Sequence, residues 1–304
     1  MYTWETMDKT LDYIEEHLAE EIRNETLAGI AGLSLFYYQR LFKRLVRKTV
    51  QEYIKLRRLA RAAEDLKDIK RKILDTALDY GFSDHANFTR AFRETYQITP
   101  EEYRKTQPML NTFDRPQLSM NYIMADENVP LIADGIVLEI QRQVLHQPEP
   151  YLGLEKAVSI AGQVPAGEST GIDVPGELWR EFHEKKTGAE DVINGGIELG
   201  MSHSASFETG TFLYFAGGRA VNAEAGRNGM VKRLLPAGEY IVCRIEAESF
   251  VELVTTALNQ ANRYLFEIWL KNRQIVTEPF SAEKYYKDIS ECPYMEIWVK
   301  EMEF

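Results

Sequence analysis

Cysteine is scarce in this chain of 304 residues, which holds only Cys243 and Cys292. Two cysteines are too few for a disulfide framework and are not spaced as zinc ligands, so we expect both thiols to be reduced. No run approaches eighteen apolar residues, and segment 1–20 is acidic and amphipathic, unlike a signal peptide. We therefore expect a cytoplasmic protein with no membrane partner.

Catalytic signatures are incomplete. The letters GESTG at 167–171 fit the GxSxG pattern, but they follow Pro165 in a predicted loop, without the strand–turn–helix setting of a nucleophile elbow. The pair His183–Glu184 lacks the second histidine of HExxH, and the other histidines are scattered. The sequence therefore predicts no catalytic residue, no metal site and no cofactor, and we do not expect an enzyme.

Positive charge is the minority sign, with 36 Lys and Arg against 47 Asp and Glu and a net charge of −11. A net negative charge argues against binding to nucleic acid. The positive side chains, however, are concentrated in one segment, which favours such binding. Residues 40–61 carry nine cations against one acid, Glu52, whereas residues 1–25 carry eight acids against two cations and predict a solvated helix. Residues 108–304 hold 17 basic and 29 acidic side chains. This asymmetry indicates two domains with different partners.

An internal repeat occupies the first hundred residues. Shifting the chain by fifty residues aligns Arg40 with Arg90 and Phe42 with Phe92. Further matches at this shift are Tyr38 with Phe88, Lys43 with Arg93, Thr49 with Thr99, Glu52 with Glu102 and Tyr53 with Tyr103. The repeat indicates one supersecondary unit used twice.

Each copy has the pattern of two helices joined by a tight turn. In the first copy, Gly32 supplies the positive φ that a turn needs and Ser34 can cap the following helix. In the second copy, Gly81 takes the turn position and either Ser83 or Asp84 the cap. Both patterns are typical of helix-turn-helix units.

A long helix is predicted between the copies. Residues 51–68 contain no glycine or proline and keep apolar residues at helical spacing. Leu41 and Leu45 in the first copy, and Phe88 and Phe92 in the second, should turn inward. One chain could then address two successive major-groove segments about 34 Å apart.

At this point the chain resembles the AraC/XylS DNA-binding domain, over about residues 5–106. The resemblance is carried by LAGIAGLSLFYYQRLFKRL, EYIKLRRLARAAEDL and ILDTALDYGFSDHANFTRAFRETYQITPEEYRK, with GF, FxRAF and TPxxYR in order. Where the family commonly has Gly and Pro in the first unit, this chain has Arg47 and Val50, and where the second unit usually has Gly it has Gln97. These departures affect turns rather than the expected base-reading positions.

The resemblance implies that each second helix reads double-stranded DNA. In the first unit it places Phe36, Gln39 and Arg40 at base edges and Tyr37, Lys43 and Arg44 nearer the backbone. In the second unit it places His85, Asn87, Thr89 and Arg90 at the bases and Arg93 toward phosphate. Arg suits guanine and Gln suits adenine as bidentate partners. A structural alternative, in which Arg40 and Arg90 pair with carboxylates, stays open.

Downstream of Arg104 the pattern changes. Residues 108–136 carry three prolines among polar residues and predict a linker, with a short strand near 118–124. From 137 to 304, short apolar strands accompany two helices, which predicts an antiparallel α+β domain. The predicted strands are 137–145, 211–215, 240–245 and 294–299, and the predicted helices are 177–185 and 250–270.

This second domain resembles a GyrI-like effector-binding domain, which also follows the AraC-type domain in Rob-like regulators. The resemblance is carried by YLGLE, ELW, GTFLYFAGG, LLPAGEYIVCRI, EIWL and AEKYY. It implies an acid at Glu283 followed by Tyr285, and we expect Trp179, Tyr214 and Trp269 as an aromatic wall. Rings around a carboxylate favour a cationic or aromatic small molecule. The alternatives are that the tryptophans are core residues and that Glu283 is a surface carboxylate.

Together these patterns predict a multidomain transcription regulator. A DNA-binding domain of two helix-turn-helix units occupies 1–107, a linker 108–136, and a small-molecule effector domain 137–304. The effector would act by changing affinity for DNA or for a state bound to RNA polymerase. Two alternatives remain open: a second domain that binds a protein partner, and a GyrI-like hydrolase of small electrophiles.

Overall fold

The computed structural model describes residues 3–133, 135–160, 167–187, 192–206, 208–221, 229–286 and 293–302, so Cys292 lies outside the described residues. The chain divides into two compact units. Unit 1 contains Met1–Tyr122 and Gly167–Asp173, and unit 2 contains Ile123–Ala166 and Val174–Phe304. The prediction of a helical amino-terminal region and an antiparallel, sheet-rich second region is confirmed.

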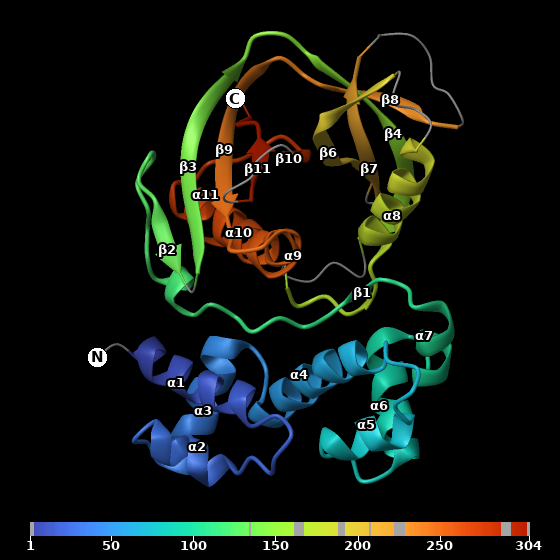
Figure 1. Cartoon of the computed structure of the whole chain (residues 1–304). Helices are drawn as coiled ribbons and strands as arrows, with labels where there is room; N and C mark the ends of the chain where they lie inside the picture. Colours follow the sequence, from blue (N-terminus) through green and yellow to red (C-terminus); the bar gives the residue numbers. More distant parts are fainter. Residues whose placement is uncertain are drawn as a thin grey trace. The chain divides into compact units, whose positions relative to one another are not determined.

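Unit 1 is mainly helical (Figure 1). Its helices are α1 (Thr3–Glu16), α2 (Asn24–Ile30), α3 (Leu35–Val46), α4 (Val50–Asp65), α5 (Ile73–Asp79), α6 (His85–Tyr96) and α7 (Pro100–Thr106). Side chains of Ser34, Thr49, Asp84 and Thr99 accept hydrogen bonds from the first-turn N–H groups of α3, α4, α6 and α7. These bonds satisfy backbone donors that a helix start leaves unpaired and so fix where each helix begins.

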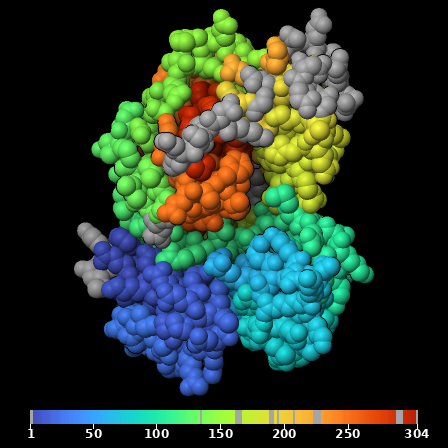
Figure 2. Space-filling view, in the orientation of Figure 1, coloured from blue at the N-terminus to red at the C-terminus, as the bar shows by residue number. Residues whose placement is uncertain are grey.

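Helix α4 contributes to two separate hydrophobic cores. Its first half places Val50, Tyr53 and Ile54 against residues of α1, α2 and α3. Its second half places Leu59 and Ala62 against residues of α5, α6 and α7. In the space-filling view these two helical groups are the blue and the cyan-to-green lobes of unit 1 (Figure 2).

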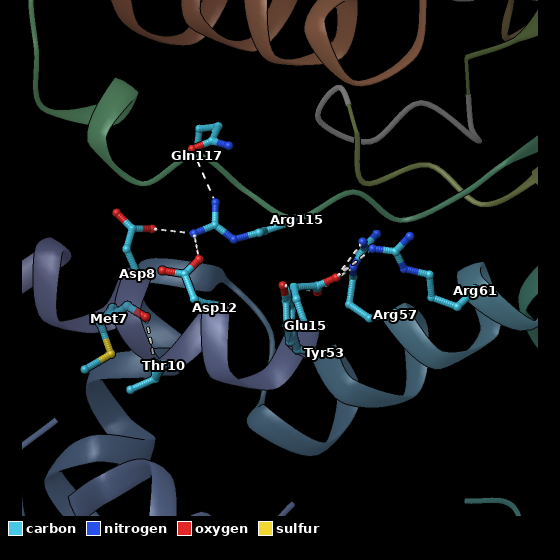
Figure 3. Close-up of polar contacts among 10 residues, drawn as sticks. All are labelled: Met7, Asp8, Thr10, Asp12, Glu15, Tyr53, Arg57, Arg61, Arg115 and Gln117. Atoms are coloured by element: carbon cyan, nitrogen blue, oxygen red, sulfur yellow. Dashed lines mark hydrogen bonds and ion pairs between the residues drawn. The ribbon is translucent and has the colours of Figure 1, made fainter. Parts of the chain in front are cut away.

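The acidic face of α1 is neutralised by arginines rather than solvated, so the sequence prediction of a solvated helix is wrong there (Figure 3). Arg57 of α4 binds Glu15 through two hydrogen bonds of 2.7 and 2.8 Å, and Tyr53 donates to the same carboxylate at 2.9 Å. Arg115 binds Asp12 at 2.7 Å. These contacts join α1 to α4 and to the chain beyond α7.

Residues 108–122, expected as linker, are grouped with unit 1. Phe113 and Leu118 are buried in its first core. Short strand β1 (Leu110–Asn111) pairs antiparallel with β5 (Gly171–Ile172), which arrives from far along the chain. The strand predicted near 118–124 is wrong, because a 3-10 turn, η1 (Ser119–Asn121), turns the chain there.

Unit 2 is built on a nine-stranded antiparallel sheet in the order β2-β3-β9-β11-β10-β6-β7-β4-β8. Its strands are β2 (Leu131–Ala133), β3 (Ile136–Leu145), β4 (Glu149–Ser159), β6 (Ile193–Ser206), β7 (Thr211–Ala220), β8 (Val231–Leu235), β9 (Gly238–Glu246), β10 (Ser281–Tyr286) and β11 (Tyr294–Val299). Each predicted strand of this domain is present, and β2, β4, β6, β8 and β10 were not predicted.

Two helical segments accompany this sheet. Helix α8 (Val174–Lys186) packs against β4 and β7 and buries Leu178 and Phe182. The second segment, orange in Figure 2, lies on the surface of unit 2 in that view. It runs through α9 (Phe250–Glu252), η2 (Leu253–Ala257), α10 (Leu258–Arg263), η3 (Tyr264–Trp269) and α11 (Leu270–Asn272), where η2 and η3 are π-helical.

None of the helices in the described part of the chain is long and apolar enough to cross a membrane. Within the same residues, no group of three or more His, Cys, Asp or Glu side chains is arranged to hold a metal ion.

Candidate functional site

Helix α3 separates a buried face from a charged exposed face. Tyr38, Phe42 and Val46 are buried, at the spacing of successive turns. Phe36 is 75% exposed and Tyr37 52%. The exposed polar side chains on this helix are Gln39, Arg40, Lys43 and Arg44. Among the described residues none of these three cations pairs with a carboxylate, so their charge is available to an external anion.

Helix α6 repeats this arrangement with more internal hydrogen bonding. Phe88 and Phe92 are buried, as predicted, whereas Arg90 and Arg93 are exposed. Asn87 donates to Ser83 at 3.2 Å and accepts from Arg90 at 3.3 Å. The guanidinium of Arg90 is therefore oriented before any ligand arrives.

Two further predicted residues of α6 direct a polar group toward the protein itself. The Nε2 atom of His85 lies 3.0 Å from a carboxylate oxygen of Glu101 in α7. The hydroxyl oxygen of Thr89 is buried. Of the predicted residues on α6, Arg90, Arg93 and Asn87 thus present the most accessible polar groups.

Not every cation between residues 40 and 61 belongs to this exposed surface. Arg57 is bound to Glu15 and to the carbonyl of Phe113. Arg58 donates to the carbonyls of Leu18 and Glu20. Sequence reasoning counted these cations as available charge, because spacing does not distinguish a buried arginine from an exposed one.

In unit 2, four of the five predicted effector residues come together around Glu283 of β10. The hydroxyl of Tyr214 donates to Glu283 Oε2 at 3.0 Å, and that of Tyr285 donates to the same oxygen at 2.9 Å. Trp179 of α8 donates to the Tyr214 oxygen at 3.0 Å. Its ring meets that of Tyr285 edge-on at 5.2 Å. The result is a half-buried carboxylate with three aromatic rings gathered around it.

Gly200 of β6 makes room for this cluster, and sequence reasoning missed it. A Cβ at this position would lie 2.4 Å from the Tyr214 hydroxyl and 2.9 Å from Glu283 Oε2. Only glycine therefore allows the tyrosine and the carboxylate to meet there. An isolated glycine within a strand is a sequence signal of such close approach, and it was available in the stretch IELGMS.

Trp269 lies apart from this group. Its side chain is fully buried in η3, and its indole N–H donates to the carbonyl of Ala125 at 3.0 Å. The guanidinium of Arg273 stacks on its ring at 4.6 Å. These contacts assign the residue to the packing of the helical segment, because its one polar atom is satisfied by the chain itself.

Two protein families match the chain in separate regions. A family described as "Helix-turn-helix domain" matches residues 27–106. A family described as "Integron-associated effector binding protein" matches residues 156–299. The first match covers α3 and α6, and the second covers the residues around Glu283.

Curated relatives match about a third of the chain. The regulatory protein SoxS of Salmonella typhimurium is 36% identical over 94 residues, which are 31% of this chain and 88% of SoxS. The uncharacterized HTH-type transcriptional regulator YbfP of Bacillus subtilis is 40% identical over 104 residues, 34% of this chain and 35% of YbfP. The transcriptional regulator Rob of S. typhimurium is 34% identical over 118 residues, 39% of this chain and 41% of Rob. The match thus spans little more than a third of YbfP and of Rob.

Solved structures are similar to parts of the chain. An AraC-type regulator from Chromobacterium violaceum is 26% identical and covers 34% of this chain and 93% of its own, with a TM-score of 0.33. SAV2435 bound to tetraphenylphosphonium is 20% identical and covers 54% of this chain and 94% of its own, with a TM-score of 0.38. By its identity to SoxS over most of that protein, and by its two family matches, the chain belongs to the AraC family of DNA-binding transcription regulators and carries an effector-binding domain.

Proposed function

We propose that α2–α3 and α5–α6 are two helix-turn-helix units, joined by α4, that bind successive major-groove segments of one DNA site. The observation that carries this proposal is that α3 and α6 have the same arrangement of buried and exposed residues. Both helices bury aromatic residues on one face and expose arginines on the other. Both end in a left-handed residue, Arg47 at φ 63° and Gln97 at φ 64°. Because α4 belongs to both cores, it sets the separation of the two helices.

Within this proposal, Phe36, Gln39 and Arg40 read bases, and Tyr37, Lys43 and Arg44 bind the backbone. On α6, His85, Asn87 and Arg90 face the bases and Arg93 faces phosphate, whereas Thr89, whose hydroxyl oxygen is buried, is left out of this set. Arg90 is held by Asn87, whereas Arg40 is exposed on α3 without such a bond among the described residues. Arg40 therefore loses more side-chain freedom on binding, and Arg90 is the more preorganised of the two.

For unit 2 we infer a small lipophilic cation as effector. Glu283 supplies negative charge, and Trp179, Tyr214 and Tyr285 supply ring faces and edges around it. A cation gains attraction from an aromatic face, and the gain grows when water is excluded. Effector binding would change the affinity of the protein for DNA, or for RNA polymerase bound at that DNA. Such a change requires that the effector bind one of two states of the protein more tightly than the other.

The DNA proposal is tested by titrating salt against binding to a duplex selected from random sequence and to an unselected duplex. Arg40→Ala should cost about 1–3 kcal/mol on the selected duplex alone. Lys43→Ala should weaken binding to both duplexes and lower the salt slope by about one. Glu16→Gln, on the exposed end of α1, is the charge control. Equal losses on both duplexes for Arg40→Ala would remove its role in base reading.

The effector proposal is tested by calorimetry with tetraphenylphosphonium and with a neutral aromatic of similar size. Glu283→Gln keeps the shape of the side chain and removes its charge, so it should weaken binding of the cation at least tenfold and leave the neutral compound unaffected. Glu184→Gln, at an exposed position on the same helix as Trp179, is the matched control. Cation binding that is unchanged in Glu283→Gln would show that this carboxylate does not select the effector.

A further inference from the structure

Residues 167–173 form a short strap that belongs to unit 1, although the chain on its carboxyl side continues directly into unit 2. The strap carries β5, and its next residue, Val174, is the first of α8. It is therefore joined by one peptide bond to the helix that carries Trp179. Any shift of the first turn of α8 along its axis acts directly on the end of the strap.

The strap is fastened to the region beyond α7 by backbone hydrogen bonds. Strand β5 pairs with β1, with Leu110 opposite Ile172 and Asn111 opposite Gly171. On one side of this pair, the Asp173 N–H donates to the Met109 carbonyl at 2.8 Å. On the other, the Asp114 N–H donates to the Gly167 carbonyl at 2.9 Å. Leu110 packs against the core of α5–α7, so this end of the strap is tied to the second helix-turn-helix unit.

A partly buried ion pair fastens the strap to the first helix-turn-helix unit. Lys48 Nζ lies 3.0 Å from Glu168 Oε2, and the side chain of Glu168 is only 7% exposed. Lys48 directly follows Arg47, the residue that ends α3, and precedes Thr49, which caps α4. The pair therefore holds the strap at the junction between a base-reading helix and the helix that sets the spacing of the two units.

We propose that this strap is the element through which effector binding next to Trp179 changes DNA binding, because it is joined by a peptide bond to α8 and held by hydrogen bonds and an ion pair to both halves of unit 1. This proposal rests on the function proposed above. An effector that inserts beside Trp179 displaces α8, and the strap transmits the displacement to the α3–α4 junction and to β1. The spacing or angle of the two base-reading helices then changes, and with it the affinity for a two-groove site.

The test measures affinity for the selected duplex with and without saturating tetraphenylphosphonium, on the full chain. Wild type should show a change of at least fivefold between the two conditions, which is the usual size of such coupling. Glu168→Gln should bind the cation within twofold of wild type and reduce the change in DNA affinity to less than twofold. Glu64→Gln, which removes an exposed carboxylate of α4 paired with Lys67, should retain the full change. Full coupling in Glu168→Gln overturns the proposal.

A second measurement separates failure of the strap from failure of the effector class. Hydrogen exchange at the Asp114 and Asp173 amides reports the two bonds that border the β1–β5 pair. Trp179→Ala, which loosens α8 without any ligand, should accelerate exchange at both amides at least tenfold relative to Glu184→Gln. If wild type does not bind tetraphenylphosphonium but Trp179→Ala has this effect, the effector class is wrong and the strap stands. If exchange is unchanged in Trp179→Ala, the strap is not coupled to α8 and the proposal fails.

Discussion

Removing Glu15 should destabilise unit 1 far more than removing a neighbouring acid. Its side chain is 12% exposed, and that of its partner Arg57 is 11% exposed. Arg57 gives Glu15 two hydrogen bonds and the Phe113 carbonyl a third. In Glu15→Leu the arginine stays buried and loses two of its three acceptors. Breaking a buried pair from one side costs about 3–5 kcal/mol, so we expect a loss of unfolding free energy of about 3 kcal/mol or more.

The magnitude is measured by native-state hydrogen exchange of peptides from α1 and α4, because this reports unit 1 separately. Glu16→Leu, one residue on and exposed, should change the same free energy by less than about 0.5 kcal/mol. The double variant Glu15→Leu/Arg57→Met should recover most of the loss, since it leaves no unpaired charge. A loss below about 1 kcal/mol in Glu15→Leu, or a double variant no more stable than the single one, would refute the reasoning.

The same pair predicts a pH dependence. Burial alone would raise the pKa of Glu15, but the hydrogen bonds and charge of Arg57 outweigh it and hold this pKa below its usual value. A carboxylate with a lowered pKa in the folded state stabilises that state above its unfolded pKa of about 4.3 and loses this contribution as the pH falls through the folded pKa. The stability difference between wild type and Glu15→Leu should therefore be constant near neutral pH and shrink in acid below about pH 4. A difference that grows in acid would contradict this sign.

Three further substitutions test the turns and the effector cluster. Gly81→Ala should lower unfolding free energy in urea by about 1–2 kcal/mol, because φ is +71° and the new Cβ would lie 2.8 Å from Arg58. Gln97→Gly should raise the unfolding free energy by up to about 1 kcal/mol, since glycine adopts the left-handed φ of 64° readily. An unchanged unfolding free energy would mean that the backbone at Gln97 is not strained. Gly200→Ala should weaken tetraphenylphosphonium binding about tenfold or more in calorimetry with an unchanged circular dichroism spectrum, because the methyl group occupies the place of the Tyr214 hydroxyl. Unchanged binding would remove that contact from the site.

The sequence predicted most where local pattern decides the outcome. The fifty-residue repeat and the apolar spacing of α3 and α6 indicated helices whose buried faces are those observed, apart from Leu41 and Leu45, which are only partly buried. The apolar segment YMEIWV located β11 with its observed bounds. Four of the five predicted effector residues meet, at the acidic position Glu283 that the resemblance implied.

Long-range contacts account for what the sequence did not predict. The segment around Phe113 is irregular and proline-containing, and its burial depends on Tyr53, sixty residues earlier, whose ring it meets at 5.9 Å. Trp269 has the apolar spacing of a pocket residue and of a core residue alike, and the carbonyl of Ala125 decides between them. No local sequence pattern predicts that β5 pairs with β1, because the pairing of strands far apart in the sequence is set by tertiary packing.

The return of residues 167–173 to unit 1 also limits how this protein can be recombined. A chimaera that joins residues 1–107 to a foreign effector domain would lack both strands of the β1–β5 pair and the carboxylate partner of Lys48. A fragment extended to residue 122 would keep β1 but present it as an unpaired edge, which favours association between chains. Unit 1 is built from two separate stretches of the sequence, so an exchange of everything beyond residue 107 removes part of it.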